Sequence, residues 1–223
     1  MDHSVAELFV IMALNPEKGR ITIDSIHFRY SLTGAILMDY LGGEEFKVEN
    51  KRVVPSLRIN DDAIHILFSE RIMRSSRNRK ISFWVRILTR KSRFVFSEMT
   101  KNLERKKIIR IEQKRFLNIF PYKRYWFTDN TIREKMIEDL RSILIHGRRP
   151  DKKEIMLLGI VEASRAYRLL SRERGEARLL RQKNTELLKG DVVSTEISQA
   201  INEVQAAIVA SVVAASAAAH SGH

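Results

Sequence analysis

The sequence predicts a mainly α-helical fold: one compact domain over residues 1–219 around a buried C-terminal apolar helix, with small β-hairpins and a frayed tail at 220–223. Of the 223 residues, 44% are hydrophobic and 30% are charged. That is enough apolar material for a core and too much for a disordered chain. Apolar residues recur at helical spacing in most segments, and short turns with glycine or proline separate them. We find no internal repeat and no low-complexity linker.

Capping signals and chain breakers place the elements of the first hundred residues. Ser4 followed by Glu7 is a capping-box pattern at a helix start. Gly42-Gly43 ends a later helix, because glycine tolerates the left-handed C′ position. The expected elements are a helix at 4–14, a turn at 15–19, a strand at 20–23, a helix from Asp24 or Ser25 to about Tyr40, a hairpin at 45–54 turning near 50–51, a helix capped by Asp61 or Asp62, a basic loop at 71–80, a short helix at 81–88 and a helix at 91–105.

The second half of the chain is predicted to contain one hairpin followed by helices. The stretch 204–219 is apolar nearly all round, which is typical of a buried central helix. Its 16 residues are too short and too weakly hydrophobic for a bilayer span. The expected elements are strands at 108–111 and 116–120 around a turn at 112–115, a helix from Thr128 or Asp129 to His146 ended by Gly147, helices at 151–170 and 172–188, and the apolar helix.

Positive charge is concentrated in the middle of the chain. The net charge is +13, from 40 Lys and Arg against 27 Asp and Glu. Residues 1–50 carry 4 basic and 8 acidic side chains, residues 51–150 carry 26 and 10, and residues 151–223 carry 10 and 9. Such a field suits a polyanion: nucleic acid, an anionic membrane or a phosphate headgroup. A basic face that only aids solubility is the alternative.

The sequence contains no recognisable catalytic or metal-binding pattern. It has no cysteine, no Gly-rich nucleotide-binding loop and no His pair at metal-ligand spacing. We expect His27 and His65 to be structural or exposed, and Glu134 and Glu138 to belong to a solvated charged face. We therefore expect no enzymatic activity, no cofactor and no metal.

The start of the chain and its composition favour a cytoplasmic location. MDHSVAEL has no basic segment before an apolar stretch, so we expect no signal peptide. The lack of cysteine and of Asn-x-Ser/Thr sequons fits the same compartment.

A basic cluster at the start of the helix at 91–105 is the first candidate site. Arg90, Lys91 and Arg93 lie at or near this helix start, and Arg86 lies on the preceding helix. Free N–H groups at a helix start favour anions, and guanidinium groups add bidentate contacts to phosphate. Cations here are unfavourable with the helix dipole unless an anion compensates. The cluster therefore indicates a phosphate site, with side chains that simply point into water as the alternative.

The hairpin IIRIEQKRFLNIF is the second candidate site. Its expected tip combines Lys114 and Arg115 with Phe116 and Leu117. Cations would meet anionic headgroups while apolar side chains enter the acyl boundary. An ordinary hairpin with Phe116 packed inward is the alternative.

The same segment also supports a winged-helix-like nucleic-acid-binding module over residues 81–120. The basic helix would recognise DNA and the hairpin would be the wing. Phe94, Val95, Phe96 and Met99 leave little polar surface for base edges, whereas Lys101, Arg105 and Lys106 could contact phosphates. An adaptor whose basic face binds acidic protein tails is a third hypothesis.

The order of several segments is similar to that of the Golgi phosphoprotein 3 family over about residues 5–215. The similar segments, in order, are ELFVIMALNPEKGRI, YSLTGAILMDYL, FSEMTKNLERKKIIRI leading into the hairpin, FTDNTIREKMIEDL after it, and the closing helix rich in alanine and valine. The resemblance implies a largely helical single domain around a buried C-terminal helix.

The resemblance also implies a function. Eukaryotic members bind phosphatidylinositol 4-phosphate at Golgi membranes and hold glycosyltransferase tails, and their hairpin helps membrane insertion and self-association. Their headgroup pocket uses a tryptophan and several arginines. Arg93 falls on one pocket arginine, Thr33 and Phe96 stand where two others are expected, and Asp24 stands at or next to the tryptophan position.

We therefore predict a peripheral membrane protein that binds anionic headgroups of the phosphatidylinositol 4-phosphate type. The expected phosphate-binding residues are Arg93, Arg90, Lys91, Arg86 and Thr33, and the expected membrane-inserting residues are Lys114, Arg115, Phe116 and Leu117. The expected partners are anionic lipid, tails of membrane proteins and a second copy through the hairpin. Nucleic acid is the alternative.

Overall fold

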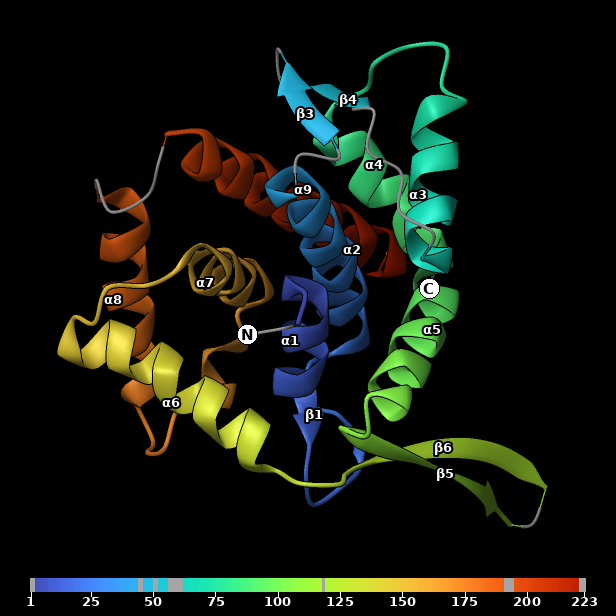
Figure 1. Cartoon of the computed structure of the whole chain (residues 1–223), viewed down its shortest axis with the longest axis vertical. Coiled ribbons are helices and arrows are strands. Elements are labelled where there is room, and N and C mark those ends of the chain that lie inside the picture. Colours follow the sequence, from blue (N-terminus) through green and yellow to red (C-terminus); the bar gives the residue numbers. More distant parts are fainter. Residues whose placement is uncertain are drawn as a thin grey trace.

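The computed structural model describes residues 3–43, 46–49, 52–55, 62–117, 119–190 and 195–220. Helices form its body, and the described strands form two-stranded antiparallel sheets, which confirms the predicted mainly helical class (Figure 1). The elements are α1 (Val5–Ala13), β1 (Leu14–Asn15), β2 (Arg20–Ile21), α2 (Ser25–Gly42), β3 (Phe46–Glu49), β4 (Arg52–Pro55), α3 (Ala63–Met73), α4 (Ile81–Leu88), η1 (Thr89–Lys91), α5 (Ser92–Arg105), β5 (Ile109–Phe116), β6 (Phe120–Phe127), α6 (Thr131–His146), α7 (Lys152–Ser164), η2 (Ala166–Leu169), α8 (Glu176–Lys189) and α9 (Thr195–His220).

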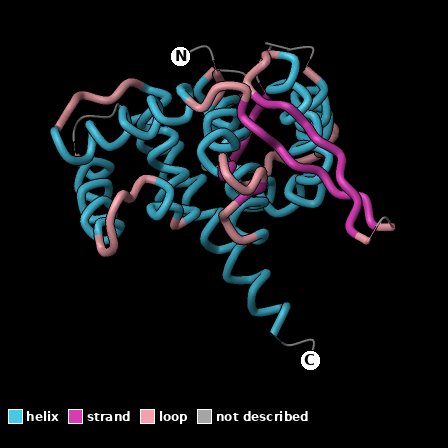
Figure 2. Tube along the Cα trace, turned by 90° about the horizontal axis from the view of Figure 1, so that it is seen from below, coloured by secondary structure: helices cyan, strands magenta, loops and turns pink. Residues whose placement is uncertain are grey.

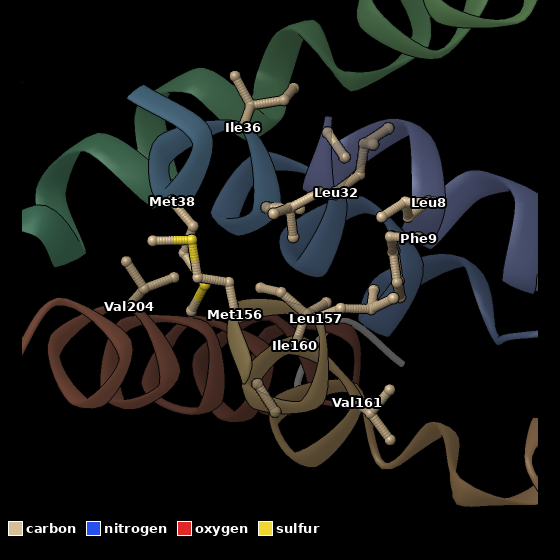
Figure 3. Packing of buried hydrophobic residues seen from close by; sticks show 14 of the residues in the cluster. Leu8, Phe9, Leu32, Ile36, Met38, Met156, Leu157, Ile160, Val161 and Val204 are labelled. Carbon is tan, nitrogen blue, oxygen red and sulfur yellow. The ribbon is translucent and has the colours of Figure 1, made fainter. Parts of the chain in front are cut away.

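The core lies where α1, α2, α7 and α9 meet. Helix α9 packs against α2, α4 and α7, and α1 packs against α2 and α7. Figure 3 shows the interdigitating side chains at this centre. Every residue of α1 is buried, so this helix runs through the interior rather than along the surface. The labelled core residues are Leu8, Phe9, Leu32, Ile36, Met38, Met156, Leu157, Ile160, Val161 and Val204.

Two glycines let α9 approach its neighbours closely. A Cβ atom at Gly34 of α2 would lie 2.5 Å from Ile208 Cδ1 and 3.0 Å from Val204 Cγ1. A Cβ atom at Gly159 of α7 would lie 2.8 Å from Ile201 Cγ2. The glycines are therefore required by packing.

The start of α1 is anchored by polar groups from two directions. Ser4 and Glu7 form the predicted capping box. Asp39 of α2 accepts hydrogen bonds from the backbone N–H groups of Val5 (2.7 Å) and Ala6 (2.9 Å). Burial raises the pKa of Asp39 to about 6, although these hydrogen bonds favour the charged form.

Most of the predicted caps are confirmed. Asp24 and Asp62 are N-caps whose side chains accept backbone N–H groups, and Asp151, for which no cap was predicted, caps α7 in the same way. Gly147 ends α6 in the left-handed conformation at φ 71°. Gly43 ends α2 at φ −84°, so the expected left-handed glycine is wrong there. The predicted turn at 50–51 and residue 61 lie outside the described residues.

Several predicted helix boundaries are wrong. The helix expected at 151–170 ends at Ser164, because Arg165 adopts φ 54° and a 3₁₀ turn follows. Helix α8 begins only at Glu176. Helix α6 begins at Thr131, whose N–H group bonds the Asp129 side chain at 2.9 Å.

Helix α9 is longer than predicted. It has 26 residues, and the expectation of burial holds for the face of its first half that packs in the core. By length and composition alone, the segment Ser198–Ala218 is long and apolar enough to cross a membrane. The prediction that this helix is too short and too weakly hydrophobic for a bilayer span is therefore wrong. Only 33% of that segment is buried. The tail beyond 220 lies outside the described residues.

Candidate functional site

A groove of about 290 Å³ lies between the start of α2 and the start of α5. Phe28 and Phe96 form part of its wall, in edge-to-face contact at 5.4 Å between ring centroids. The lining residues are Ile21, Ile23, Ser25, Phe28, Arg29, Ser92, Arg93 and Phe96. The groove is thus mainly apolar and carries two guanidinium groups, so we call it the Arg29–Arg93 groove.

The two arginines of this groove come from different helices. Arg29 Nε donates a hydrogen bond to Ser92 Oγ at 2.8 Å, which fixes the Arg29 side chain across the groove. Arg93 is exposed on the first turn of α5. Lys91, the N-cap of α5, makes no side-chain cap hydrogen bond. Two guanidinium groups beside a helix start can hold a phosphate or another oxyanion.

The sequence did not indicate Arg29, although a signal was available. Arg29 precedes Thr33 by four residues, so the two share one face of α2. The resemblance expects a pocket arginine at Thr33. In the structure, Arg29 supplies a guanidinium group from one turn earlier.

Thr33 itself plays an internal role. It is 1% exposed, and its hydroxyl donates to the Arg29 carbonyl at 3.1 Å. The Thr89 hydroxyl donates to Thr33 Oγ1 at 3.0 Å. Thr33 does not line the Arg29–Arg93 groove, so the prediction of a phosphate contact is not supported by its position.

Asp24 also lies outside this groove. Its carboxylate caps α2 by accepting the N–H groups of Ile26 (3.1 Å) and His27 (3.0 Å), and it pairs with the His27 ring at 2.6 Å. Asp24 lines a separate hollow with residues that include Arg165 and Arg168. The carboxylate therefore does not face an anion held between Arg29 and Arg93.

Arg86, Arg90 and Lys91 are exposed beside the groove rather than in it. The Arg86 guanidinium lies 6.0 Å from the centroid of the Phe83 ring, and the Arg79 guanidinium lies 5.1 Å from the same centroid. None of the three cations pairs with a carboxylate of the described residues. Together with Arg79 and Arg93 they form a basic strip along α4, η1 and the start of α5.

The hairpin β5–β6 is longer than predicted. Ile109 pairs with Phe127 and Phe116 pairs with Phe120, so the predicted turn at 112–115 is wrong and the chain reverses after Phe116. The tip exposes Phe116 (61%), Leu117 (71%), Ile119 (70%) and Phe120 (62%). We call these four residues the hairpin tip. Figure 2 shows the hairpin projecting from the helical body.

The predicted tip cations differ in their surroundings. Lys114 pairs with Glu112 at 3.3 Å and lies 5.8 Å from the centroid of the Trp126 ring. The Trp126 indole donates to Glu112 at 2.7 Å, and this hydrogen bond lowers the pKa of Glu112. Arg115 is exposed and pairs with Pro121 in the ladder next to the tip.

The base of the hairpin is joined to the groove. Tyr125 meets Phe96 edge-to-face at 5.3 Å, and its N–H group donates to the Gly19 carbonyl at 2.9 Å. Arg124 donates to the Lys18 carbonyl at 3.0 Å. Because Phe96 also lines the groove, the hairpin and the groove are parts of one connected surface.

The histidine and glutamate residues considered as candidates in the sequence have structural roles. His65 is buried against Tyr40, with ring centroids 4.8 Å apart. Glu138 pairs with Arg172, and Glu134 accepts a hydrogen bond from Asn130 at 2.6 Å. Within the described ranges, no three His, Cys, Asp or Glu side chains are placed to hold a metal ion.

Comparison with known proteins gives one family. The model of the Golgi phosphoprotein 3 family matches residues 5–204. Comparison with curated proteins gives no match. The family match spans the Arg29–Arg93 groove, the basic strip and the hairpin.

Proposed function

The chain belongs to the Golgi phosphoprotein 3 family, and on that premise we propose that it is a non-enzymatic peripheral membrane protein of the cytoplasmic side. It binds anionic phospholipid headgroups at the Arg29–Arg93 groove and the basic strip, and it inserts the hairpin tip into the membrane interface. Tails of membrane proteins and a second copy bound through the hairpin are the further partners that we expect.

The hairpin tip is the observation that carries this proposal. Four large apolar side chains are 61–71% exposed at the end of a projecting ribbon. Burying a large apolar side chain is worth about 1.5–3 kcal/mol. Exposed clusters of this kind mark interaction sites, and an apolar tip next to cations suits the membrane interface.

The cations supply attraction that the apolar tip lacks. Each Lys or Arg near an anionic membrane adds about 1 kcal/mol. The basic strip and Arg115, which have no carboxylate partner among the described residues, can therefore raise the membrane affinity and orient the protein. Neither burial nor charge alone gives stable anchoring, and the combination gives reversible binding.

The groove supports recognition of a headgroup phosphate. Arg29 and Arg93 can contact phosphate oxygens, while Phe28 and Phe96 offer an apolar wall to the rest of the headgroup. Thr33 stands where the family has a pocket arginine, and Asp24 stands at or next to the position of the family's tryptophan. The groove therefore has two guanidinium groups and no tryptophan among its lining residues. We therefore expect a modest preference for phosphatidylinositol 4-phosphate over other anionic lipids.

The apolar tip favours this proposal over nucleic-acid binding. The wing of a winged helix contacts phosphates and sugars, which require polar or cationic side chains. The hairpin tip exposes four apolar side chains and therefore offers no polar or cationic group to a phosphate: Phe116, Leu117, Ile119 and Phe120.

Co-sedimentation with vesicles tests the proposal. Three vesicle sets are used at about 0.15 M salt: neutral lipid, phosphatidylserine, and phosphatidylinositol 4-phosphate at matched charge. A DNA duplex is included as competitor. We expect binding to both anionic sets, a loss of about tenfold or more for the double variant Phe116→Asp/Leu117→Asp, and loss of phosphoinositide preference for Arg29→Ala/Arg93→Ala.

Leu179→Asp is the matched control for the tip variant. Leu179 is 49% exposed on α8, away from the hairpin (Figure 1). It should bind vesicles like wild type. Absence of binding to anionic vesicles, or capture by DNA in preference to them, would contradict the proposal.

A further inference from the structure

Helix α9 has an inner half that is fixed in the core. Val204 and Ile208 are buried against Gly34 of α2, and Ile201 packs on Gly159 of α7. Gln205 Nε2 donates to the Gly159 carbonyl at 2.9 Å. This half cannot leave the body without opening the core.

The outer half of α9, residues 209–218, has a bare apolar face. Val209 is 45% exposed and Val213 is 63% exposed, one helical turn apart. Ala210, Ala214 and Ala217 are exposed as well. No charged side chain occurs between Val204 and Ala219. A helix that faces water normally carries polar residues on its exposed face, so this face is unusual for a solvated surface.

Ser211 and Val212 are still buried against the body, and the turns beyond them project from the molecule. Figure 2 shows the last turns of α9 leaving the helical body toward the bottom of the view, while the hairpin projects to the right. Helix α9 also packs along α4, which leads directly into η1 with Arg90 and Lys91. These residues of α9 lie beyond the 5–204 match of the family model, so this feature comes in addition to the family's matched body.

We propose that the outer half of α9 is a second membrane-inserting element, in addition to the hairpin tip, that lies in the interface of an anionic bilayer. This inference rests on the proposed membrane binding. It commits to lipid because the chain carries a net charge of +13 and the hairpin tip is proposed to enter the same anionic surface. An anionic surface attracts that charge.

The geometry favours insertion over spanning. Residues 209–220 extend about 18 Å at 1.5 Å per residue, which is shorter than the roughly 30 Å hydrocarbon core. The preceding residues, which a span would need, are fixed against Gly34 and Gly159. The outer half can therefore enter one leaflet while the body stays outside.

The test uses the double variant Val209→Asp/Val213→Asp in the full chain with phosphatidylserine vesicles. Both side chains are exposed, so we expect an unchanged thermal midpoint. We expect vesicle affinity to fall by about tenfold. A bimane or nitrobenzoxadiazole label on Val213→Cys, in a chain without other cysteines, should shift to shorter wavelength on the vesicles.

The outcomes separate this inference from the proposed function. If wild type binds, the Phe116→Asp/Leu117→Asp variant fails and Val209→Asp/Val213→Asp binds normally, the inference is wrong and the proposed function stands. If wild type binds no anionic vesicle, both are wrong. If the α9 variant keeps vesicle binding but loses a dimer seen by sedimentation velocity, this face binds a second copy and the inference is overturned.

Discussion

Arginine serves two different purposes in two regions of this molecule. In the region of α6, α7 and α8, four arginines pair with carboxylates: Arg141 with Glu176 at 2.7 Å, Arg148 with Glu154 at 2.5 Å, Arg181 with Glu162 at 3.4 Å and Arg172 with Glu138. On the face of α4, η1, α5 and the hairpin, no ion pair joins Arg79, Arg86, Arg90, Lys91, Arg93 or Arg115 to another part of the described structure.

The difference shows where the positive charge is available to a partner. The positive charge of a paired arginine is neutralised by a carboxylate of the same chain. Removing that arginine leaves the negative charge of the carboxylate without a partner. An unpaired exposed arginine contributes little to stability and can attract an external anion. Net charge alone does not distinguish these two cases.

Substitution Arg141→Ala should lower the free energy of unfolding by about 3 kcal/mol. The Arg141 side chain is 8% exposed, pairs with Glu176 and donates to the Leu170 carbonyl at 2.6 Å. Urea unfolding measures the loss. Vesicle binding of the folded variant should match wild type, and a loss below about 1 kcal/mol would show that the pair is not structural.

Acid should weaken the same pair. The Arg141 side chain and the Arg172 N–H group hold the pKa of Glu176 at about 2, below its usual value of 4.5. The stabilising contribution is therefore present above about pH 4.5 and is lost as the pH falls through 2. Urea unfolding between pH 5 and pH 2 should show a smaller fall for Glu176→Gln than for wild type. If the free energy of unfolding falls equally with pH in wild type and in Glu176→Gln, Glu176 is not the group that causes the acid sensitivity.

Neutralising the basic strip should affect binding alone. Arg90→Gln/Lys91→Gln should weaken binding to phosphatidylserine vesicles by about thirtyfold, because each cation contributes about 1 kcal/mol. The free energy of unfolding should change by less than about 0.5 kcal/mol, since both side chains are exposed. A strongly destabilised variant would mean that these cations have a structural role.

Substitution Arg181→Gln should have the smallest effect. Arg181 pairs with Glu162 but its side chain is 57% exposed, and exposed pairs are worth little. We expect a change of less than about 0.5 kcal/mol in urea unfolding and none in vesicle binding. A larger loss of unfolding free energy would show that exposed ion pairs such as Arg181–Glu162 stabilise the fold as the buried Arg141–Glu176 pair does.

Elements with local signals could be predicted from the sequence. The capping box of Ser4 and Glu7, the N-caps Asp24 and Asp62 and the closing Gly147 each depend on a few neighbouring residues. The left-handed Arg165 carries no such signal, because arginine rarely adopts this conformation. The helix at 152–164 therefore ended earlier than the sequence indicated.

The hairpin shows why a turn can be misplaced. The residues at 112–115 are polar and look like a turn, but they face solvent on a projecting two-stranded ribbon. The reversal itself follows Phe116 and is flanked by apolar residues, which ordinary turn chemistry does not predict. The apolar tip was expected at Phe116 and Leu117, while Ile119 and Phe120 join it only through the longer register.

The groove and α9 depend on contacts between distant segments, which a comparison of sequence positions does not give. Arg93 was identified from the resemblance, whereas Arg29, one turn before Thr33, was assigned to the groove only once α2 and α5 were placed side by side. The apolar sequence of α9 predicted burial, yet the helix extends beyond the core that holds Ile208. Contacts between distant segments decided both cases.

Site-specific fluorescence would test the central proposal most directly. The chain has no cysteine, so Leu117→Cys and Arg178→Cys can each carry a single environment-sensitive label, on the hairpin tip and on the exposed face of α8. With phosphatidylserine vesicles, the label at 117 should brighten and shift to shorter wavelength, while the label at 178 should stay as in buffer. No change at 117, or equal changes at both positions, would contradict membrane insertion of the hairpin tip.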